Sequence, residues 1–171
     1  EAGVCILRMR RPENTTIHRK ENAMHVLHID TTARETMTDI TPRLEELVRA
    51  GNIRSGLLFV YTPHTTTALT IKKAEDRELF KETMEKIGEP VAASKVVRRD
   101  ILSHLRALVP ENSSFLHAEG NSDAHVKASL FGSSVQVMVE EGRLLLGTWQ
   151  RVFLCEFDGP RKRKIWVRSC R

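Results

Sequence analysis

The segment from His117 to His125 has, at every second position, a side chain that can bind a metal ion or exchange a proton. It reads His-Ala-Glu-Gly-Asn-Ser-Asp-Ala-His. In an extended chain, side chains two residues apart point to the same side. One face would then carry two imidazoles and two carboxylates, from the set His117, Glu119, Asn121, Asp123 and His125. This density predicts a site for metal binding or proton transfer.

The second half of this segment also has the pattern of a short helix over residues 124–131. Ser122 or Asp123 can cap its first turn, and Gly132 is a typical residue just past a helix end. On this interpretation the alternation of side chains breaks after Asn121, and only the first half of the segment is extended.

The predicted helix would have an apolar side and an anion-binding end. Val126 and Leu130 lie one turn apart and would face the core. The first N–H groups of a helix have no partner within it and favour a phosphate. We expect Lys127 and Arg143 to supply further positive charge to such an anion.

Three histidines are the candidate metal ligands. Neutral imidazole is the commonest metal ligand, and three protein ligands with an open fourth position are typical of catalytic zinc. We expect His64, His117 and His125 to converge on a divalent metal, zinc or magnesium. The alternative is that they hydrogen-bond the backbone. Glu119 would orient a bound histidine or move a proton, unless it is a solvated loop carboxylate.

Two residues further along the chain could contact a heterocycle. Trp149 could stack on an aromatic ring, although a tryptophan in a strand is more often part of a core or an interface. Gln150 has an amide that can bind a heterocycle edge. Thr65 and its neighbours fit the preference of strands for branched residues better than the role of a nucleophile. Cys155 is most simply a buried apolar residue.

Composition limits the class of protein. The 171 residues include three cysteines, an odd number without a Cys-x-x-Cys pair, which favours a reducing compartment. No apolar run approaches the roughly 20 residues of a membrane span. We therefore expect a soluble, cytoplasmic protein without membrane contact. The net charge of +5 suits anionic ligands. The basic block 161–164 fits a charged turn better than a nucleic-acid site, and aromatic residues for base stacking are few.

Hydrophobic periodicity predicts alternating strands and helices, followed by a run of strands. Residues 1–22 would be an N-terminal extension and residues 23–171 a single domain. Thr41 and Asp100 are the expected N-caps of two helices. The expected strands cover residues 24–30, 57–62, 66–71, 134–139, 143–148, 152–157 and 164–167. The expected helices cover residues 41–51, 74–87 and 100–110, and the expected hairpin turns are Glu141-Gly142 and Asp158-Gly159-Pro160.

Several strings together resemble the YjbQ family, also called UPF0047. They are Pro63-His64-Thr65-Thr66, then Glu119-Gly120-Asn121-Ser122-Asp123-Ala124-His125, then Gly147-Thr148-Trp149-Gln150, and finally Glu156-Phe157-Asp158-Gly159-Pro160-Arg161. The resemblance implies an α+β domain with a strongly bent, mostly antiparallel sheet, sandwich-like or half-barrel-like, and two to three helices. It also implies a homotrimer.

The family is described as a secondary thiamine-phosphate synthase, which implies a transferase that joins two phosphorylated heterocycles. On this basis we expect a phosphorylated small molecule as the ligand. The expected catalytic residues are His64, Glu119 and Asp123, and the expected substrate or phosphate ligands are Thr65, Asn121, Lys127, Arg143, Trp149 and Gln150. The alternative is a non-catalytic homotrimer that binds a metal or an anion.

The chain departs from the family pattern in three places. After Ile71 the usual acidic and amide-rich string is replaced by Lys72-Lys73-Ala74-Glu75-Asp76, which favours the non-catalytic alternative. The turn Glu141-Gly142 replaces Asn-Gly, and a Glu at positive φ costs about 1 kcal/mol. The segment 72–110 is longer than in common members, which predicts a surface insertion.

Overall fold

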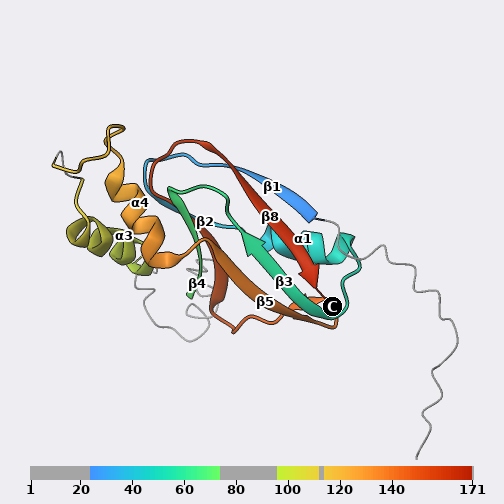
Figure 1. Cartoon of the computed structure of the whole chain (residues 1–171). Coiled ribbons are helices and arrows are strands. Elements are labelled where there is room, and N and C mark those ends of the chain that lie inside the picture. Colours follow the sequence, from blue (N-terminus) through green and yellow to red (C-terminus); the bar gives the residue numbers. More distant parts are fainter. Residues whose placement is uncertain (1–23, 74–95, 112–113, 171) are drawn as a thin grey trace, which may run out of the picture.

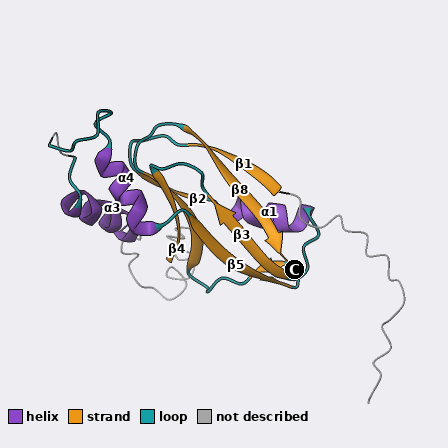
Figure 2. Cartoon of the chain, in the orientation of Figure 1, coloured by secondary structure: helices purple, strands orange, loops and turns teal. Residues whose placement is uncertain are grey.

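The computed structural model describes residues 24–73, 96–111 and 114–170, in which the chain forms three helices and eight strands (Figures 1 and 2). The predicted extension 1–22, the predicted helix 74–87 and most of the predicted insertion lie outside these residues. The division into an extension and one domain therefore stays a prediction.

The larger of two sheets has five antiparallel strands in the order β1-β8-β3-β5-β6. Alternate residues of β3, β5 and β8 are buried, as expected for a sheet that packs on one face only. Strand β1 is at one edge and pairs with β8. The strands are β1 (Met24–Asp30), β3 (Gly56–Tyr61), β5 (Ser134–Glu140), β6 (Arg143–Leu144) and β8 (Lys162–Cys170).

The smaller sheet has three strands in the order β2-β7-β4, also antiparallel. They are β2 (Thr36–Asp39), β7 (Gln150–Glu156) and β4 (Thr67–Lys73). The central strand β7 is buried without interruption from Val152 to Glu156. A continuous buried run shows that this sheet is covered on both faces.

The main core lies between the two sheets. The inward side chains of β1, β3, β5 and β8 meet those of β4 and β7, and α1 (Thr41–Ala50) adds its apolar side. Fully buried members include Leu44, Leu58, Leu154 and Ile165. Each such side chain contributes about 1.5–3 kcal/mol through burial.

Two further helices cover the outer face of the three-stranded sheet. They are α3 (Val96–Leu108) and α4 (Ser122–Phe131), which Figure 1 shows together at one end of the molecule. A second core of Met37, Phe153, Cys155 and Phe157 packs against Leu105 of α3 and Ala124 and Ala128 of α4. The layers are therefore sheet, sheet and helices, and the predicted α+β class with a bent antiparallel sheet is confirmed.

Several predicted helix details are wrong. The N-cap of α1 is Ile40, because the Thr41 hydroxyl accepts a hydrogen bond from Val152 N–H instead (2.8 Å). Asp100 lies inside α3, which begins at Val96. The prediction of α4 is confirmed, but its apolar side is not: Val126 and Leu130 are exposed.

Two predicted hairpin features also fail. The strand expected over residues 143–148 is only the two-residue β6, because a turn with a Gln150 N–H to Gly147 C=O bond follows it. The segment Asp158-Gly159-Pro160 joins no hairpin, since β7 and β8 belong to different sheets. The turn at Glu141 is confirmed, with φ of 50° at Glu141 and 77° at Gly142. None of the described helices has the length and apolar character to cross a membrane.

Gly159 is predicted to tolerate no side chain. A Cβ atom there would lie 2.4 Å from Ala33 O and 2.9 Å from Thr31 Oγ1, so the backbone of the β1–β2 loop would have to move. We expect Gly159→Ala to lower the free energy of unfolding by about 1–3 kcal/mol, measured by urea denaturation. The control is Gly147→Ala, where a Cβ meets only the flexible Gln150 side chain. Equal effects of the two changes would contradict this packing.

Candidate functional site

A buried ion pair joins the two sheets. Glu156, the last residue of β7, is fully buried, and Arg163 near the start of β8 is 6% exposed. Arg163 Nε and Nη2 donate to the two Glu156 carboxylate oxygens at 2.6 and 2.5 Å. Arg163 Nη2 also donates to Thr66 Oγ1, just before β4 (2.9 Å). Such a bidentate contact fixes the relative orientation of the two side chains as well as pairing their charges.

Glu156 also organises the loop that follows it. Its Oε1 accepts hydrogen bonds from the backbone N–H groups of Phe157 (3.1 Å) and Asp158 (2.9 Å). Its Oε2 accepts one from the Thr31 hydroxyl at 3.0 Å, and Thr31 Oγ1 in turn accepts from Arg161 N–H (2.8 Å). One carboxylate thus joins the loop after β7 to the loop between β1 and β2.

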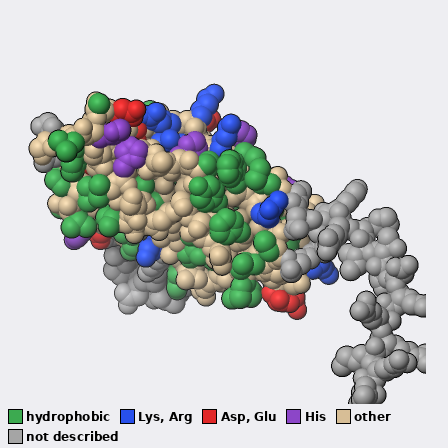
Figure 3. Space-filling model, in the orientation of Figure 1, with side chains coloured by type: hydrophobic (Ala, Val, Ile, Leu, Met, Phe, Trp, Pro, Cys, Tyr) green, Lys and Arg blue, Asp and Glu red, His purple; other side chains and the backbone are tan. Residues whose placement is uncertain are grey.

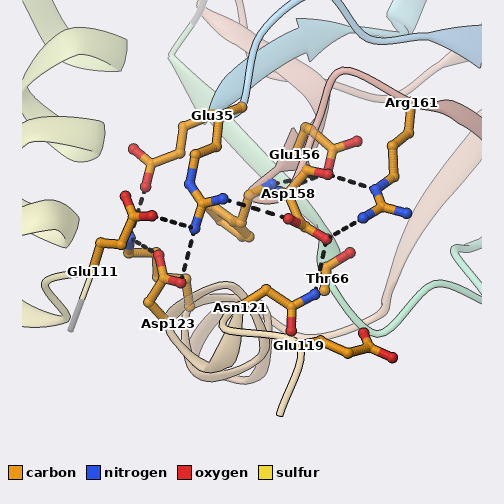
Figure 4. Close-up of polar contacts among 12 residues, drawn as sticks. Glu35, Thr66, Glu111, Glu119, Asn121, Asp123, Glu156, Asp158 and Arg161 are labelled. Atoms are coloured by element: carbon orange, nitrogen blue, oxygen red, sulfur yellow. Dashed lines mark hydrogen bonds and ion pairs between the residues drawn. The ribbon is translucent and has the colours of Figure 1, made fainter. Parts of the chain in front are cut away.

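Asp158 is the second centre of the site. Its Oδ2 accepts from Arg161 Nη2 (2.8 Å) and from Asn121 Nδ2 (3.0 Å), as Figure 4 shows. Arg34 lies on its other oxygen, with Nη1 at 3.6 Å from Oδ1. Asp158 is 8% exposed, whereas the Arg161 side chain is 55% exposed. Arg161 is therefore a fixed guanidinium with a face open to solvent.

Asn121 carries an unpaired acceptor. The residue is 7% exposed, and its Oδ1 has no hydrogen-bond partner among the described residues. Its orientation is fixed by Asp158, because a flipped amide would turn its oxygen toward a carboxylate. An unpaired buried acceptor costs about 1–3 kcal/mol.

Lys127 and Asp123 form a buried charge group inside α4. Lys127 is 1% exposed, and its Nζ donates to Asp123 Oδ2 (2.9 Å) and to Glu35 Oε1 (2.7 Å). Asp123 also accepts from Arg34 Nη2 (3.1 Å). Both predicted site residues are thus engaged with protein partners. In this arrangement the Lys127 ammonium pairs with the Asp123 and Glu35 carboxylates rather than with a bound ligand.

His64 lies in the loop between β3 and β4 and is in its neutral form. Burial lowers its pKa, and the neighbouring positive charge of Arg163 lowers it further. Its Nε2 accepts a hydrogen bond from Lys164 N–H at 2.9 Å. The proton of the neutral ring must therefore sit on Nδ1. His64 offers an N–H donor, not a free base, at its other nitrogen.

His117 and His125 lie together at the start of α4. Their rings meet edge to face with centroids 5.2 Å apart, and Glu119 Oε2 is 3.7 Å from His117 Nε2. Within residues 24–73, 96–111 and 114–170, no group of three or more His, Cys, Asp or Glu side chains is arranged to hold a metal ion. These residues of one chain therefore do not fit a complete metal site, and the three-histidine set stays a prediction.

The remaining predicted residues lie apart from this cluster. In the register of β7 with β4, Gln150 pairs with Lys73 while Glu156 pairs with Thr67, so Gln150 and Glu156 are at opposite ends of a strand of about 20 Å. The Gln150 side chain accepts a hydrogen bond from Gly147 N–H (2.9 Å). Trp149 in this turn and Arg143 at the start of β6 are exposed, and Thr65 is exposed next to His64.

Some residues of the site were missed by sequence reasoning: Arg34, Glu35, Glu156, Asp158, Arg161 and Arg163. Four of them stand in or next to the string Glu156-Phe157-Asp158-Gly159-Pro160-Arg161, whose alternating acids and arginine were a usable signal. Arg34 and Glu35 had no signal, because their partners are 89 and 92 residues away. Cys155, as predicted, is buried, and burial raises the pKa of its thiol to about 12.

These features define an α+β domain in which two loops and the start of one helix meet at a site of paired charges. Comparison with known proteins gives its family: the model for "UPF0047 protein YjbQ-like" matches residues 25–171. The chain belongs to the YjbQ/UPF0047 family, whose function is uncharacterised.

Relatives and solved structures agree with this assignment. A UPF0047 protein of Methanocaldococcus jannaschii is 39% identical over 82% of this chain and 88% of its own length. The UPF0047 protein YugU of Bacillus subtilis is 38% identical over 85% and 97%. The crystal structure of an uncharacterized YjbQ/UPF0047 protein from Clostridium acetobutylicum superimposes with a TM-score of 0.71 at 36% identity, covering 85% of this chain and 99% of that one.

The state of His64 predicts a pH effect on stability. Because its pKa lies below the ordinary value of about 6.5, the stability tied to neutral His64 is complete above that pH and is lost as pH falls through its folded pKa. The variant His64→Asn keeps a hydrogen-bond acceptor but does not titrate. We therefore expect its melting temperature to fall less than that of the wild type when the pH is lowered from about 7.5 to 5. Equal losses, or a nitrogen NMR spectrum with the His64 proton on Nε2, would refute this assignment.

Proposed function

We propose that this protein is a transferase that condenses two phosphorylated heterocycles, in the manner of a thiamine-phosphate synthase. In that reaction the ring nitrogen of a thiazole phosphate attacks the methylene carbon of a hydroxymethylpyrimidine diphosphate. A C–N bond forms, the C–O bond to the diphosphate breaks, and pyrophosphate leaves with the electron pair. No oxidant or reductant is needed.

The observation that carries this proposal is the arrangement around Asp158. Arg161 is held by Asp158 with half of its side chain open, and Asn121, bound to the same carboxylate oxygen, keeps an unpaired acceptor. A fixed guanidinium with one face open to solvent suits the phosphate of a ligand. Preorganised groups of this kind also stabilise charge on a leaving diphosphate.

The groups around Asp158 would have different roles in binding the substrate. The first N–H groups of α4, next to Asn121, favour a phosphate oxygen. His64 can donate its Nδ1 hydrogen to a phosphate or to a heterocycle. Glu119, 73% exposed in its side chain, is free to contact a ligand or its counter-ion. The substrate class is therefore a phosphorylated small molecule.

A divalent metal, zinc or magnesium, is part of the proposal as the group that His117 and His125 would bind. When bound it would neutralise charge on a diphosphate. Because the described residues of one chain provide two imidazoles and no third ligand group, we assign no step to the metal. We also propose that the working protein is a homotrimer and that nucleic acid is not its ligand.

A second candidate, a non-catalytic metal-binding or anion-binding homotrimer, is favoured by one observation. The buried charges balance within the protein: Arg163 faces Glu156, Lys127 faces Asp123 and Glu35, and Asp158 is shared by Arg34 and Arg161. Balanced pairs of this kind stabilise an architecture without needing a ligand.

The test is an assay of pyrophosphate release from the two phosphorylated precursors, with metal content measured on the purified protein. We expect turnover, with kcat/KM lowered roughly tenfold to a hundredfold in Arg161→Ala by loss of a charge-assisted contact. Arg43→Ala, on the exposed side of α1, is the matched control and should leave kcat/KM unchanged.

Three outcomes separate the candidates. Turnover that depends on Arg161 but not on Arg43 supports the transferase. A large loss of melting temperature with chelator, without any turnover, supports the non-catalytic protein. No turnover and no metal, with His117→Ala changing neither stability nor ligand binding, would eliminate both.

A further inference from the structure

Three side chains at one end of the five-stranded sheet form a row of hydrogen-bond donors. His28 on β1 and Lys164 on β8 are direct partners in the strand register, and both are exposed. Opposed side chains of an antiparallel pair lie on the same face, with Cβ atoms about 4.5–5.5 Å apart. His64 continues the row on the other side of β8, where its Nε2 accepts the Lys164 N–H. We call His28, Lys164 and His64 the donor row.

The end of strand β3 makes room for His64 in this row. Strand β3 pairs with β8 only as far as Tyr61 and Trp166. Two residues beyond that pair, the Lys164 N–H meets the His64 ring instead of a strand carbonyl. Because Nε2 of the ring is occupied in this way, the Nδ1 hydrogen of neutral His64 remains available as a donor.

The positive charge beside the donor row is not balanced by the protein. Within the described ranges of the chain, neither the Lys164 ammonium nor the His28 ring forms a hydrogen bond or an ion pair. Lys162 lies two residues before Lys164 on the same face, and its register partner Asp30 is the carboxylate nearest in sequence to the row. Figure 3 shows Lys, Arg and His side chains gathered along the upper margin of the molecule, above β1 and β8. Such a surface favours an anion.

His64 connects the donor row to the candidate site. Burial is the largest cause that lowers its pKa, followed by the charge of Arg163; the Glu156 carboxylate raises the pKa and Lys164 lowers it. The ring is therefore close both to the buried Glu156 and Arg163 pair and to Lys164. Arg161, the half-open guanidinium of the site, precedes Lys164 by three residues, which span at most about 10 Å of chain.

The proposed condensation needs two separate anion positions. The diphosphate leaves the methylene carbon of the pyrimidine, whereas the phosphate of the thiazole stays on the product. Arg161, fixed by Asp158, is the group placed for the leaving diphosphate. The phosphate that stays requires a second position with donors that the protein has not already paired.

We propose that the donor row is this second position and binds the phosphate of the thiazole substrate. Lys164 supplies a charge-assisted hydrogen bond, His64 donates its Nδ1 hydrogen, and His28 adds a further ring N–H. The identity of the ligand rests on the proposed function. The binding of a phosphate group to the donor row does not, because it needs no turnover.

The first test is a titration of the full chain with inorganic phosphate at low ionic strength, followed through the ring nitrogen NMR signals of His28 and His64. We expect both signals to shift and saturate, and Lys164→Gln to raise the dissociation constant at least about tenfold by loss of a charge-assisted hydrogen bond. Lys164→Arg, which keeps a cation able to bind phosphate, should restore most of the affinity.

The matched control is Lys72→Gln, which removes the same charge from an exposed lysine on β4 of the other sheet. It should leave the dissociation constant unchanged, and circular dichroism checks that each variant is folded. Absence of saturable shifts, or equal effects of Lys164→Gln and Lys72→Gln, would overturn the proposal. Binding that is lost in Arg161→Ala but kept in Lys164→Gln would do the same.

The second test compares the thiazole alcohol with its phosphate ester by calorimetry. We expect the ester to bind at least about tenfold more tightly than the alcohol, and Lys164→Gln to remove this preference. In the turnover assay, Lys164→Gln should raise the KM for the thiazole phosphate and leave the KM for the pyrimidine diphosphate unchanged.

These measurements separate the donor row from the proposed reaction. Phosphate binding that depends on Lys164, without any turnover, supports the donor row and contradicts the transferase. Turnover with wild-type dissociation constant and KM in Lys164→Gln supports the transferase and overturns the donor row.

Discussion

The buried contact between Glu156 and Arg163 is the constraint on which the rest of the site depends. Glu156 ends the central strand of one sheet, and Arg163 lies near the start of a strand of the other. Their pairing fixes how the two sheets meet, and the remaining bonds of both side chains reach Thr31, Thr66 and the backbone of Asp158. Removing one partner of such a buried pair costs about 3–5 kcal/mol, because the other charge is left uncompensated.

Asp158 is positioned by this contact, and Asp158 in turn positions Arg161 and Asn121. The loop after β7 can pass close to the β1–β2 loop only because residue 159 is glycine. Asp158 then meets Arg161 and Asn121 from two different segments of the chain. The result is a rigid set of paired charges in which Arg161 and His64 keep donors for a ligand. Rigid positioning of a few groups is what the proposed binding of a phosphorylated heterocycle would require.

Much of the fold could be predicted from the sequence, because local patterns decide it. Strand β1 begins and ends where its alternation of residues predicts, and α4 ends at Gly132 as expected. The buried side of α4 could not be predicted. The rule that apolar residues face inward failed because Lys127 and Asp123 are buried as a pair, and their partner Glu35 is 92 residues from Lys127. Likewise, no local signal shows that the chain changes sheets at Gly159.

The residues of the candidate site were likewise predictable only in part. The segment 117–125 was singled out by residue type, and it forms a turn and the start of α4 rather than one strand face. His117 lies beside His125 and Glu119, whereas Asn121 and Asp123 contact Asp158 and Lys127, so a shared site of all five stays a prediction. Arg34, Glu156 and Arg163 were not predicted, because a charged residue is expected at the surface unless its partner in the fold is known. Trp149 and Gln150 belong to a string typical of the family, but they lie at the opposite end of β7 from Glu156. Membership of a family string therefore did not show that a residue lies near the other site residues.

The most direct test of this account is a double-mutant cycle on the buried pair, with Glu156→Gln, Arg163→Met and both changes together. Unfolding free energies from urea titration would be measured for all four proteins. We expect each single change to destabilise the fold by about 3–5 kcal/mol and the double change to cost far less than their sum. Additive losses would show that the two side chains act independently and would contradict the account.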